Sequence, residues 1–235
     1  MALPQPLVSV VVPVFDEERF IEEVLRRVAA SDLRTELIVV DDGSTDGTGT
    51  ILQRLQGDLP ALQVISQGVN RGKGAAVRRG IGASTGDIVV IQDADLEYDP
   101  KDLPSLLGPI VEGRADVVYG TRLRGGEPQR AHLFWHYVGN RFLSLLTNVL
   151  YNTTISDMEV GYKAFRGELI RAIPLVSDDF RFEPEVTAKV LRRGVRLYEV
   201  PISYYGRTFD EGKKISWRDG VLAVGALLRF RFGSR

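Results

Sequence analysis

Residues 7–14 read Leu-Val-Ser-Val-Val-Val-Pro-Val, and this β-branched run predicts a strand that is buried on both faces. Residues 20–30 then carry apolar side chains at helical spacing, and residues 36–40, Glu-Leu-Ile-Val-Val, predict the next strand. A strand, a helix and a second strand in succession form the pattern of a parallel βαβ unit. The chain therefore begins as an α/β protein.

The same alternation continues through the first half of the chain. Further helices are predicted over residues 48–55 and 74–83, and further strands over residues 62–66, 87–92 and 115–120. We expect these elements to form a doubly wound, mostly parallel sheet flanked by helices.

The second half departs from this rhythm and contains neither a repeat nor a linker. The predicted elements there are a Leu- and Phe-rich helix over 132–151, strands over 160–165 and 195–204, and helices over 184–193 and 216–232. We therefore expect one domain over residues 1–215, followed by an amphipathic helix over residues 216–235.

The composition limits what the protein does. A net charge of -1 argues against nucleic acid as a partner, and the absence of cysteine excludes disulfides and thiolate metal sites. The N-terminal residues lack the features of a signal peptide, and no run reaches the roughly 18 apolar residues of a membrane span. We expect a cytoplasmic protein that meets membranes only at their surface.

Charged segments follow four of the predicted strands, where open α/β sheets bind their ligands. Three are acidic and one is basic: residues 13–18, 41–47 and 93–97, and residues 120–124. Converging carboxylates repel one another unless a cation lies among them. Oxygen ligands without His or Cys favour Mg²⁺ or Mn²⁺ over zinc, so the sequence predicts a site for one of these ions.

The order of four motifs resembles the family 2 glycosyltransferases, which have the GT-A fold. The motifs are Val-Pro-Val-Phe-Asp-Glu at 12–17, Val-Val-Asp-Asp-Gly-Ser-Thr-Asp-Gly-Thr at 39–48, Asn-Arg-Gly-Lys-Gly-Ala at 70–75, and Asp-Ala-Asp at 93–95. The resemblance implies a GT-A type sheet and a nucleotide-sugar donor.

Later motifs resemble the polyprenyl- (dolichyl-) phosphate hexose synthases within that family. They are Tyr119–Arg122, Asn140-Arg141, Asp157–Phe165, Phe182–Glu185, and the series Arg207, Lys213 and Trp217. The resemblance covers about residues 7–220. It implies an inverting enzyme that moves a hexose from GDP-mannose or UDP-glucose to a polyprenyl phosphate.

The resemblance also implies a role for each matching residue. The implied nucleotide and donor contacts are Pro13, Phe15, Glu17, Asp42, Asp93, Ala94 and Lys213. The implied metal ligands are Asp93, Asp95 and Glu97; the implied phosphate ligands are Arg122, Arg141, Arg207 and Ser144. The implied catalytic group is Asp95, Arg122, Arg207 and Asp157, the last of them near the acceptor.

Physical chemistry agrees with this division of roles. A diphosphate leaving group needs its growing negative charge neutralised, and a metal ion and arginine side chains do this. A lipid phosphate arrives as an anion, so the reaction does not require a dedicated general base.

The final helix has two interpretations. Its apolar side chains and the basic residues Arg218, Arg229 and Arg231 suit a membrane interface, whereas many amphipathic helices pack on their own protein core. Both interpretations are compatible with a separate membrane-anchoring partner and with a homo-oligomer.

Other interpretations of the motifs stay open. The first half fits a family 2 transferase with a soluble or polysaccharide acceptor equally well, and a non-enzymatic nucleotide-binding module is a further alternative. A nucleotidyltransferase would place a glycine-rich loop where this chain has residues 13–17, so the sequence argues against this class of enzyme. We interpret the glycine-rich residues 68–74 as a turn and helix start, and Glu183 and Glu185 as structural residues of a helix N-terminus.

Overall fold

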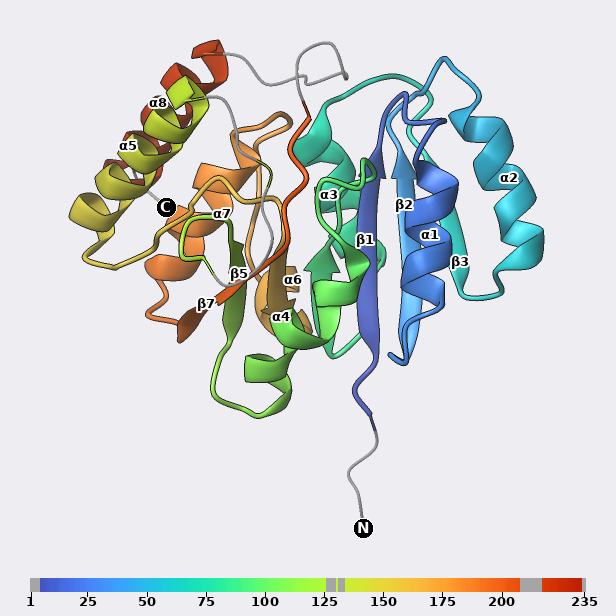
Figure 1. Ribbon diagram of the computed structural model, residues 1–235. Coiled ribbons are helices and arrows are strands. Elements are labelled where there is room, and N and C mark those ends of the chain that lie inside the picture. Colours follow the sequence, from blue (N-terminus) through green and yellow to red (C-terminus); the bar gives the residue numbers. More distant parts are fainter. Residues whose placement is uncertain (1–4, 126–129, 131–133, 208–216, 234–235) are drawn as a thin grey trace.

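A single mixed sheet of seven strands organises the molecule (Figure 1). The structure, a computed structural model, describes residues 5–125, 130, 134–207 and 217–233. The strand order is β3-β2-β1-β4-β6-β5-β7. The strands are β1 (Val8–Val14), β2 (Thr35–Asp41), β3 (Leu62–Ser66), β4 (Ile88–Ile91), β5 (Val117–Thr121), β6 (Lys163–Arg166) and β7 (Leu197–Pro201).

The central strand β1 confirms the prediction made from its sequence. All seven of its residues are buried. It pairs in parallel with β2, where Val12 lies opposite Val39, and with β4, where Val11 lies opposite Ile91. Because β1 carries helices on both faces, its run is almost continuously apolar, and the hydroxyl of the buried Ser9 donates a hydrogen bond to Glu36.

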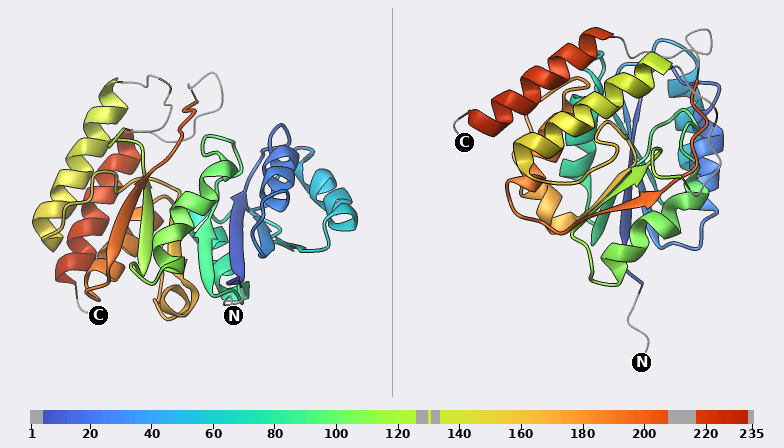
Figure 2. Two further views of the ribbon diagram at one scale, coloured as in Figure 1. Left: turned by 60° about the horizontal axis from the view of Figure 1, so that its bottom comes forward. Right: turned by 60° about the vertical axis from the view of Figure 1, so that its left-hand side comes forward.

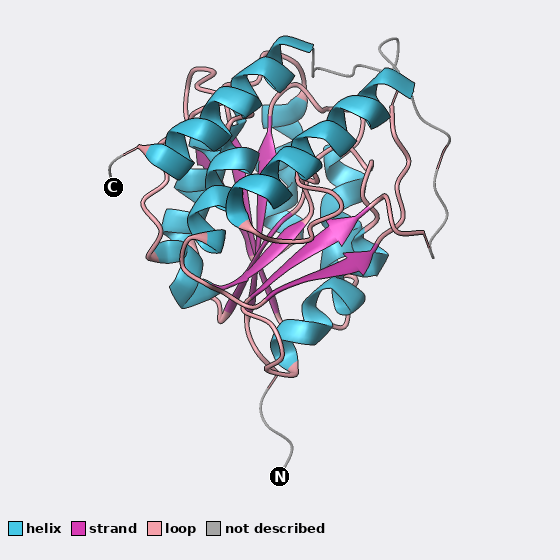
Figure 3. Cartoon of the chain, turned by 90° about the vertical axis from the view of Figure 1, so that its left-hand side faces the viewer, coloured by secondary structure: helices cyan, strands magenta, loops and turns pink. Residues whose placement is uncertain are grey.

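Helices cover both faces of the sheet (Figures 2 and 3). On one face, α1 packs against α2 and the 3₁₀ turn η1, which leads into α4; α3 and α6 pack together on the other. The helices are α1 (Ile21–Ala29), α2 (Thr48–Asp58), α3 (Lys73–Ala83), η1 (Pro100–Asp102), α4 (Leu103–Val111), α5 (Phe134–Tyr151), α6 (Gly167–Arg171), α7 (Phe182–Leu191) and α8 (Trp217–Phe232). This arrangement confirms the doubly wound α/β architecture.

The strand β6 is antiparallel to both of its neighbours, β4 and β5. The sheet is therefore mostly parallel, as predicted, with one reversed strand between its two parallel parts. This reversal carries the chain directly from residues 157–162, at the carboxyl edge of the sheet, back into the core.

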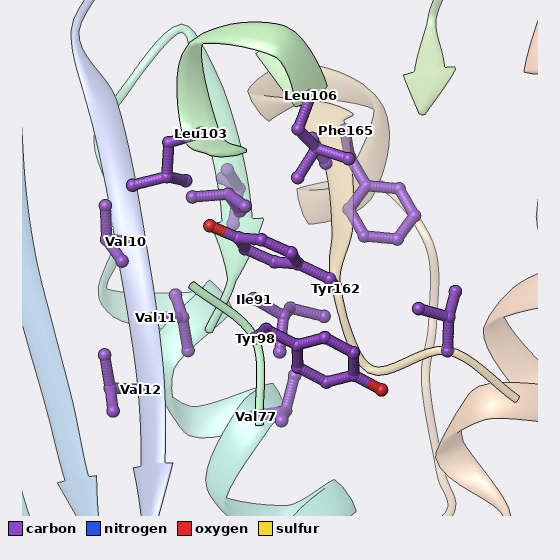
Figure 4. Packing of buried hydrophobic residues seen from close by; sticks show 14 of the residues in the cluster. Val10, Val11, Val12, Val77, Ile91, Tyr98, Leu103, Leu106, Tyr162 and Phe165 are labelled. Atoms are coloured by element: carbon purple, nitrogen blue, oxygen red, sulfur yellow. The ribbon is translucent and has the colours of Figure 1, made fainter. Parts of the chain in front are cut away.

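Stacked tyrosines tie the core to the loops at the carboxyl edge (Figure 4). The rings of Tyr98 and Tyr162 stack with their centroids 5.5 Å apart, and both side chains are buried. The hydroxyl of Tyr98 also accepts a hydrogen bond from the backbone N–H of Gly161 at 3.1 Å. The loop after β4 and the loop before β6 are thus held together beneath the site described below.

The long helices α5 and α8 lie side by side at one end of the molecule (Figures 1 and 2). Leu143 of α5 and Leu227 of α8 are buried, and the hydroxyl of Tyr151 donates a hydrogen bond to the carbonyl of Leu227 at 2.8 Å. The final helix therefore contributes part of its surface to the protein core. No helix in the described part of the chain is long and apolar enough to cross a membrane.

Candidate active site

A cavity of about 1130 Å³ opens at the carboxyl edge of the sheet, where the charged segments were predicted to meet. It lies between the first half of the chain and the helices α5 and α7. The predicted site residues that line it are Pro13, Phe15, Glu17, Asp42, Asp93, Ala94, Glu97, Arg122 and Arg207. The edge of the sheet thus gathers side chains that are far apart in the sequence.

The loop after β4 turns two of its carboxylates in the same direction. Leu96 adopts a left-handed backbone conformation with φ 58°, which a side chain other than glycine rarely takes. The backbone N–H of Glu97 donates to Oδ1 of Asp95 at 3.1 Å and closes the turn. Strained backbone of this kind concentrates at functional sites.

Arg207 lies among three carboxylates in this structure. Its Nη2 is 2.6 Å from Oδ2 of Asp95, its Nη1 is 3.2 Å from Oε2 of Glu17, and its backbone N–H donates to Oε1 of Glu97 at 2.9 Å. Burial and the charges of Asp93 and Glu97 raise the pKa of Asp95 to about 7, although Arg207 opposes this. The site holds more negative charge than Arg207 neutralises.

This surplus of carboxylate fits a divalent cation. In the described residues, however, the carboxylates of Asp93, Asp95 and Glu97 do not converge as a three-ligand metal site. Two of them face Arg207 instead, and Asp93 faces Lys73. The oxygen donors suit Mg²⁺ or Mn²⁺, and Arg207 or Lys73 lies beside each of them in this structure.

Lys73 occupies the floor of the cavity. Its Nζ is 2.8 Å from Oδ1 of Asp93 and 3.0 Å from Oε1 of Glu183. Burial opposes the lysine's charge, but these two carboxylates outweigh it and hold the pKa of Lys73 well above its usual value. The lysine therefore stays charged beneath the acidic loop.

Arg122 forms a two-pronged ion pair with Asp157, which is fully buried. Its Nε donates to Oδ2 and its Nη2 to Oδ1, each at 2.7 Å. The backbone N–H of Arg122 and Nδ2 of Asn140 supply two further hydrogen bonds to the same carboxylate. Four donors saturate Asp157, so its carboxylate holds Arg122 in place.

Asp42 organises the glycine-rich loop. Its carboxylate accepts hydrogen bonds from the backbone N–H groups of Arg71 and Gly72 and from the side chain of Gln67, each at 2.7 Å. Gly72 has φ 98° and immediately precedes α3, so this position favours glycine. The segment is a turn and helix start, as the sequence analysis interpreted it, and it also directs Lys73 into the cavity.

Comparisons with known proteins agree with this geometry. The family model described as Glycosyl transferase family 2 matches residues 9–173. The chain belongs to glycosyl transferase family 2. This assignment confirms the resemblance that the motifs carried.

Two relatives and one solved structure illustrate the relationship. The chain is 30% identical to the dodecaprenyl-phosphate galacturonate synthase of Rhizobium johnstonii over 87% of its own length and 61% of that protein's. It is 30% identical to the undecaprenyl-phosphate mannosyltransferase of Micrococcus luteus, covering 88% of this chain and 86% of the relative. The glucosyl-3-phosphoglycerate synthase of Mycobacterium tuberculosis, solved with Mn²⁺ and UDP, matches with a TM-score of 0.75 and 25% identity over 96% of this chain and 80% of that one. The last match confirms the GT-A fold.

Three residues expected at the site of this family 2 protein lie elsewhere or outside the described residues. Ser144 is 3% exposed, and its hydroxyl accepts a hydrogen bond from the backbone N–H of Met158 at 3.0 Å. Arg141 is exposed on α5 and does not line the cavity. Lys213 falls outside the described residues.

Sequence reasoning missed three charged residues of the cavity floor. Lys73, Glu159 and Glu183 all line it. From the sequence, both Glu183 and Glu185 are interpreted as structural residues of a helix N-terminus. Glu185 does have this structural role, because its carboxylate accepts hydrogen bonds from the backbone N–H groups of Val176 at 2.8 Å and Ser177 at 2.6 Å. Glu183 lines the cavity instead. A signal was available in the sequence, since both Glu159 and Glu183 lie within the motifs quoted above.

A substitution of Gly161 tests whether the close packing of the cavity floor is required for ligand binding. A Cβ at this position would collide with Oδ2 of Asp93 and press on the ring of Tyr98. We expect Gly161→Ala to displace Asp93 and to weaken nucleotide-sugar binding by about tenfold or more, since misplaced contacts at a site are costly. Titration calorimetry checks this. Gly57→Ala, on α2 and away from the cavity, also meets nothing within 4 Å and is the matched control. Unchanged affinity in Gly161→Ala contradicts the expectation.

Proposed function

We propose that this protein transfers a hexose from a nucleotide-sugar to the phosphate of a polyprenyl lipid, with inversion at the sugar. The observation that carries the proposal is the group of carboxylates and arginines at one edge of the cavity, where Arg207 faces Asp95 and Glu97. Such a set suits a diphosphate leaving group. The two relatives, a dodecaprenyl-phosphate galacturonate synthase and an undecaprenyl-phosphate mannosyltransferase, support the same acceptor.

The donor is held by its nucleotide at the first strand. Pro13, near the end of β1, and Phe15 and Glu17, just after it, lie at the cavity wall and form the base and ribose contacts. The relatives act on a galacturonate and a mannose, and the fold neighbour binds UDP, so GDP-mannose and UDP-glucose are the donors to test first.

Asp93, Asp95 and Glu97 would hold a divalent ion, Mg²⁺ or Mn²⁺, after exchanging their present contacts with Lys73 and Arg207 for the ion; the fold neighbour contains Mn²⁺. Such an ion neutralises charge on a departing diphosphate. Arg207, already beside Asp95, lies within the same group and binds a phosphate with its planar fork. The chain's own cations therefore orient the leaving group.

The acceptor needs no general base. Asp157 cannot act as one readily, because four donors already occupy its carboxylate. A lipid phosphate is ionised before it binds, and Arg122, fixed by Asp157, is suited to orient it. Positioning and electrostatics then carry the displacement.

A panel of donors and acceptors tests this function. GDP-mannose and UDP-glucose are each incubated with Mg²⁺ or Mn²⁺ and a short polyprenyl phosphate, and released nucleotide and lipid-linked sugar are measured. We expect transfer to the lipid phosphate by at least one donor. Transfer to a free sugar or a polysaccharide, with none to the lipid phosphate, overturns the acceptor assignment in favour of a soluble-acceptor transferase.

The lipid is met at the outer surface of α5 and α8, at the cytoplasmic face of a membrane. Large apolar side chains are exposed there: Phe142, Leu145 and Val149 on α5, and Val221, Leu222, Leu228 and Phe232 on α8. Phe134 and Trp135, at the start of α5, are also exposed and line the cavity. Arg218, Arg229 and Arg231 add positive charge on α8. Exposed apolar surface beside basic residues suits an anionic interface. A membrane-anchoring partner or a second copy of the chain is compatible with the same surface.

Vesicle binding checks the role of α5. We expect the triple variant Phe142→Ser, Leu145→Ser, Val149→Ser to lose about tenfold or more in affinity for anionic vesicles, because each side chain contributes apolar area. Sedimentation with vesicles at low and high salt gives the measurement. Val176→Ser, an exposed apolar residue outside α5 and α8, is the control. Equal binding by the triple variant and this control counts against the surface.

A further inference from the structure

Two carboxylate oxygens at the floor of the cavity have no partner. Oε1 of Glu159 and Oε2 of Glu183 are buried and make no hydrogen bond with any described residue. Both residues line the cavity, and the side chain of Glu183 is 5% exposed. A buried polar atom without a partner carries a substantial free-energy cost, so two carboxylate oxygens of this kind on residues of one cavity call for an explanation.

The rest of the floor is already arranged around these two oxygens. The other oxygen of Glu183 accepts from Nζ of Lys73 at 3.0 Å, and Lys73 also holds Asp93 at 2.8 Å. Lys163 is buried close by, but its Nζ donates to the backbone carbonyl of Met158 at 3.1 Å and to that of Val160. The lysines are thus bonded to other acceptors, and the two oxygens, which belong to residues that line the cavity, have no partner among the described residues.

From these oxygens we infer that Glu159 and Glu183 accept hydrogen bonds from hydroxyl groups of the donor's hexose, and that they select a neutral hexose over a hexuronate. The inference rests on the proposed function and names the sugar class of that same site. A hexose carries several hydroxyl donors, and each can satisfy a buried carboxylate oxygen. A hexuronate replaces one hydroxymethyl group with a carboxylate, which offers acceptors only.

The electrostatics of the floor point the same way. Burial and the charge of Glu183 raise the pKa of Glu159 to about 8, although Lys163 opposes this. A carboxylate is therefore disfavoured in its charged form at this place, and the carboxylate of a hexuronate would meet the same burial and the same neighbour. Like charges brought together at an interface are strongly unfavourable.

Binding measurements test the inference without turnover. Titration calorimetry in Mn²⁺ compares UDP-glucose with UDP-glucuronate and GDP-mannose with GDP-mannuronate, together with UDP and GDP alone. We expect the neutral sugar to bind about tenfold or more tightly than its uronate partner on whichever nucleotide the protein accepts. If the unaltered protein binds the two donors of a pair with equal affinity, or binds the uronate donor more tightly, the inference is overturned.

Variants then assign the selectivity to residues. Glu183→Gln keeps the side-chain shape and removes a charge, and Glu159→Gln keeps the shape and replaces one acceptor oxygen with an amide donor. Each change should narrow the hexose-to-hexuronate ratio to within about threefold while leaving the affinity for UDP and GDP unchanged. Glu185→Gln is the matched control, because Glu185 lies on the same helix with both oxygens bound to backbone N–H groups. It should lower the melting temperature and leave the ratio as it is.

The outcomes separate the inference from the proposed function. A ratio that persists in both variants, with thermal unfolding confirming that they are folded, overturns the assignment to Glu159 and Glu183 while the transferase function stands. A protein that binds neither nucleotide contradicts the proposed function, and the inference falls with it.

Discussion

Asp95→Ala should lower sugar transfer by about a thousandfold or more, because it removes a charged ligand from the place where the leaving diphosphate is neutralised. The fold should survive the change. The pKa of Asp95 is raised to about 7 by burial and by its acidic neighbours, so at neutral pH its charge is unfavourable in the folded state. Removing that charge should therefore change the stability by about 1 kcal/mol or less.

The measurement combines activity with metal binding. The variant should bind Mn²⁺ more weakly in titrations without donor, and excess EDTA should abolish transfer by the unaltered protein. Asp32→Ala, on the exposed loop between α1 and β2, is the control and should behave as the unaltered protein does. An Asp95→Ala protein with full activity, or full transfer in EDTA, would mean that these carboxylates hold no catalytic ion.

The sequence predicted those helices and strands whose burial follows a simple pattern along their whole length. β1 is buried throughout, and its β-branched run was sufficient to identify it. The helix α4 was missed because Pro104, Gly108 and Pro109 interrupt its apolar pattern; a proline in the first turn of a helix is nevertheless tolerated. The reversed direction of β6 could not be predicted, since the period of a strand carries no information on its direction.

The sequence predicted where the candidate site lies, but it did not predict which side chains contact one another within the site. Sheet topology brings the carboxyl ends of β1, β2, β4 and β5 to one edge, so acidic and basic segments at those ends had to meet. Which charged side chains form ion pairs at this edge depends on three-dimensional packing instead. Arg207 and Asp95 are far apart in the sequence, and no spacing rule connects Lys73 with Glu183. Ser144 illustrates the reverse case, since helical periodicity alone does not say that its hydroxyl faces inward.

Asp157→Ala should lower the free energy of unfolding by about 3–5 kcal/mol, the range found when one partner of a buried ion pair is removed. Asp157 is fully buried, and its loss leaves the guanidinium of Arg122 without its two-pronged partner. Burial alone would raise the pKa of Asp157, but Arg122 and Asn140 outweigh it and lower that pKa below its usual 3.8. The stabilisation is therefore present above pH 3.8 and is lost as the pH falls through the lowered value.

Urea unfolding near pH 7, with the slope of the transition recorded, provides the measurement. Asp58→Ala is the control: Asp58 pairs with Arg26 on the surface, where both side chains are about half exposed, and its loss should change stability by about 1 kcal/mol or less. Transfer should also fall in Asp157→Ala, because Arg122 is no longer held against the acceptor phosphate. A general base would behave differently, since its removal abolishes transfer while leaving the fold as stable as before. An Asp157→Ala protein of unchanged stability and no activity would therefore assign the proton transfer to Asp157 and contradict its role as the residue that positions Arg122.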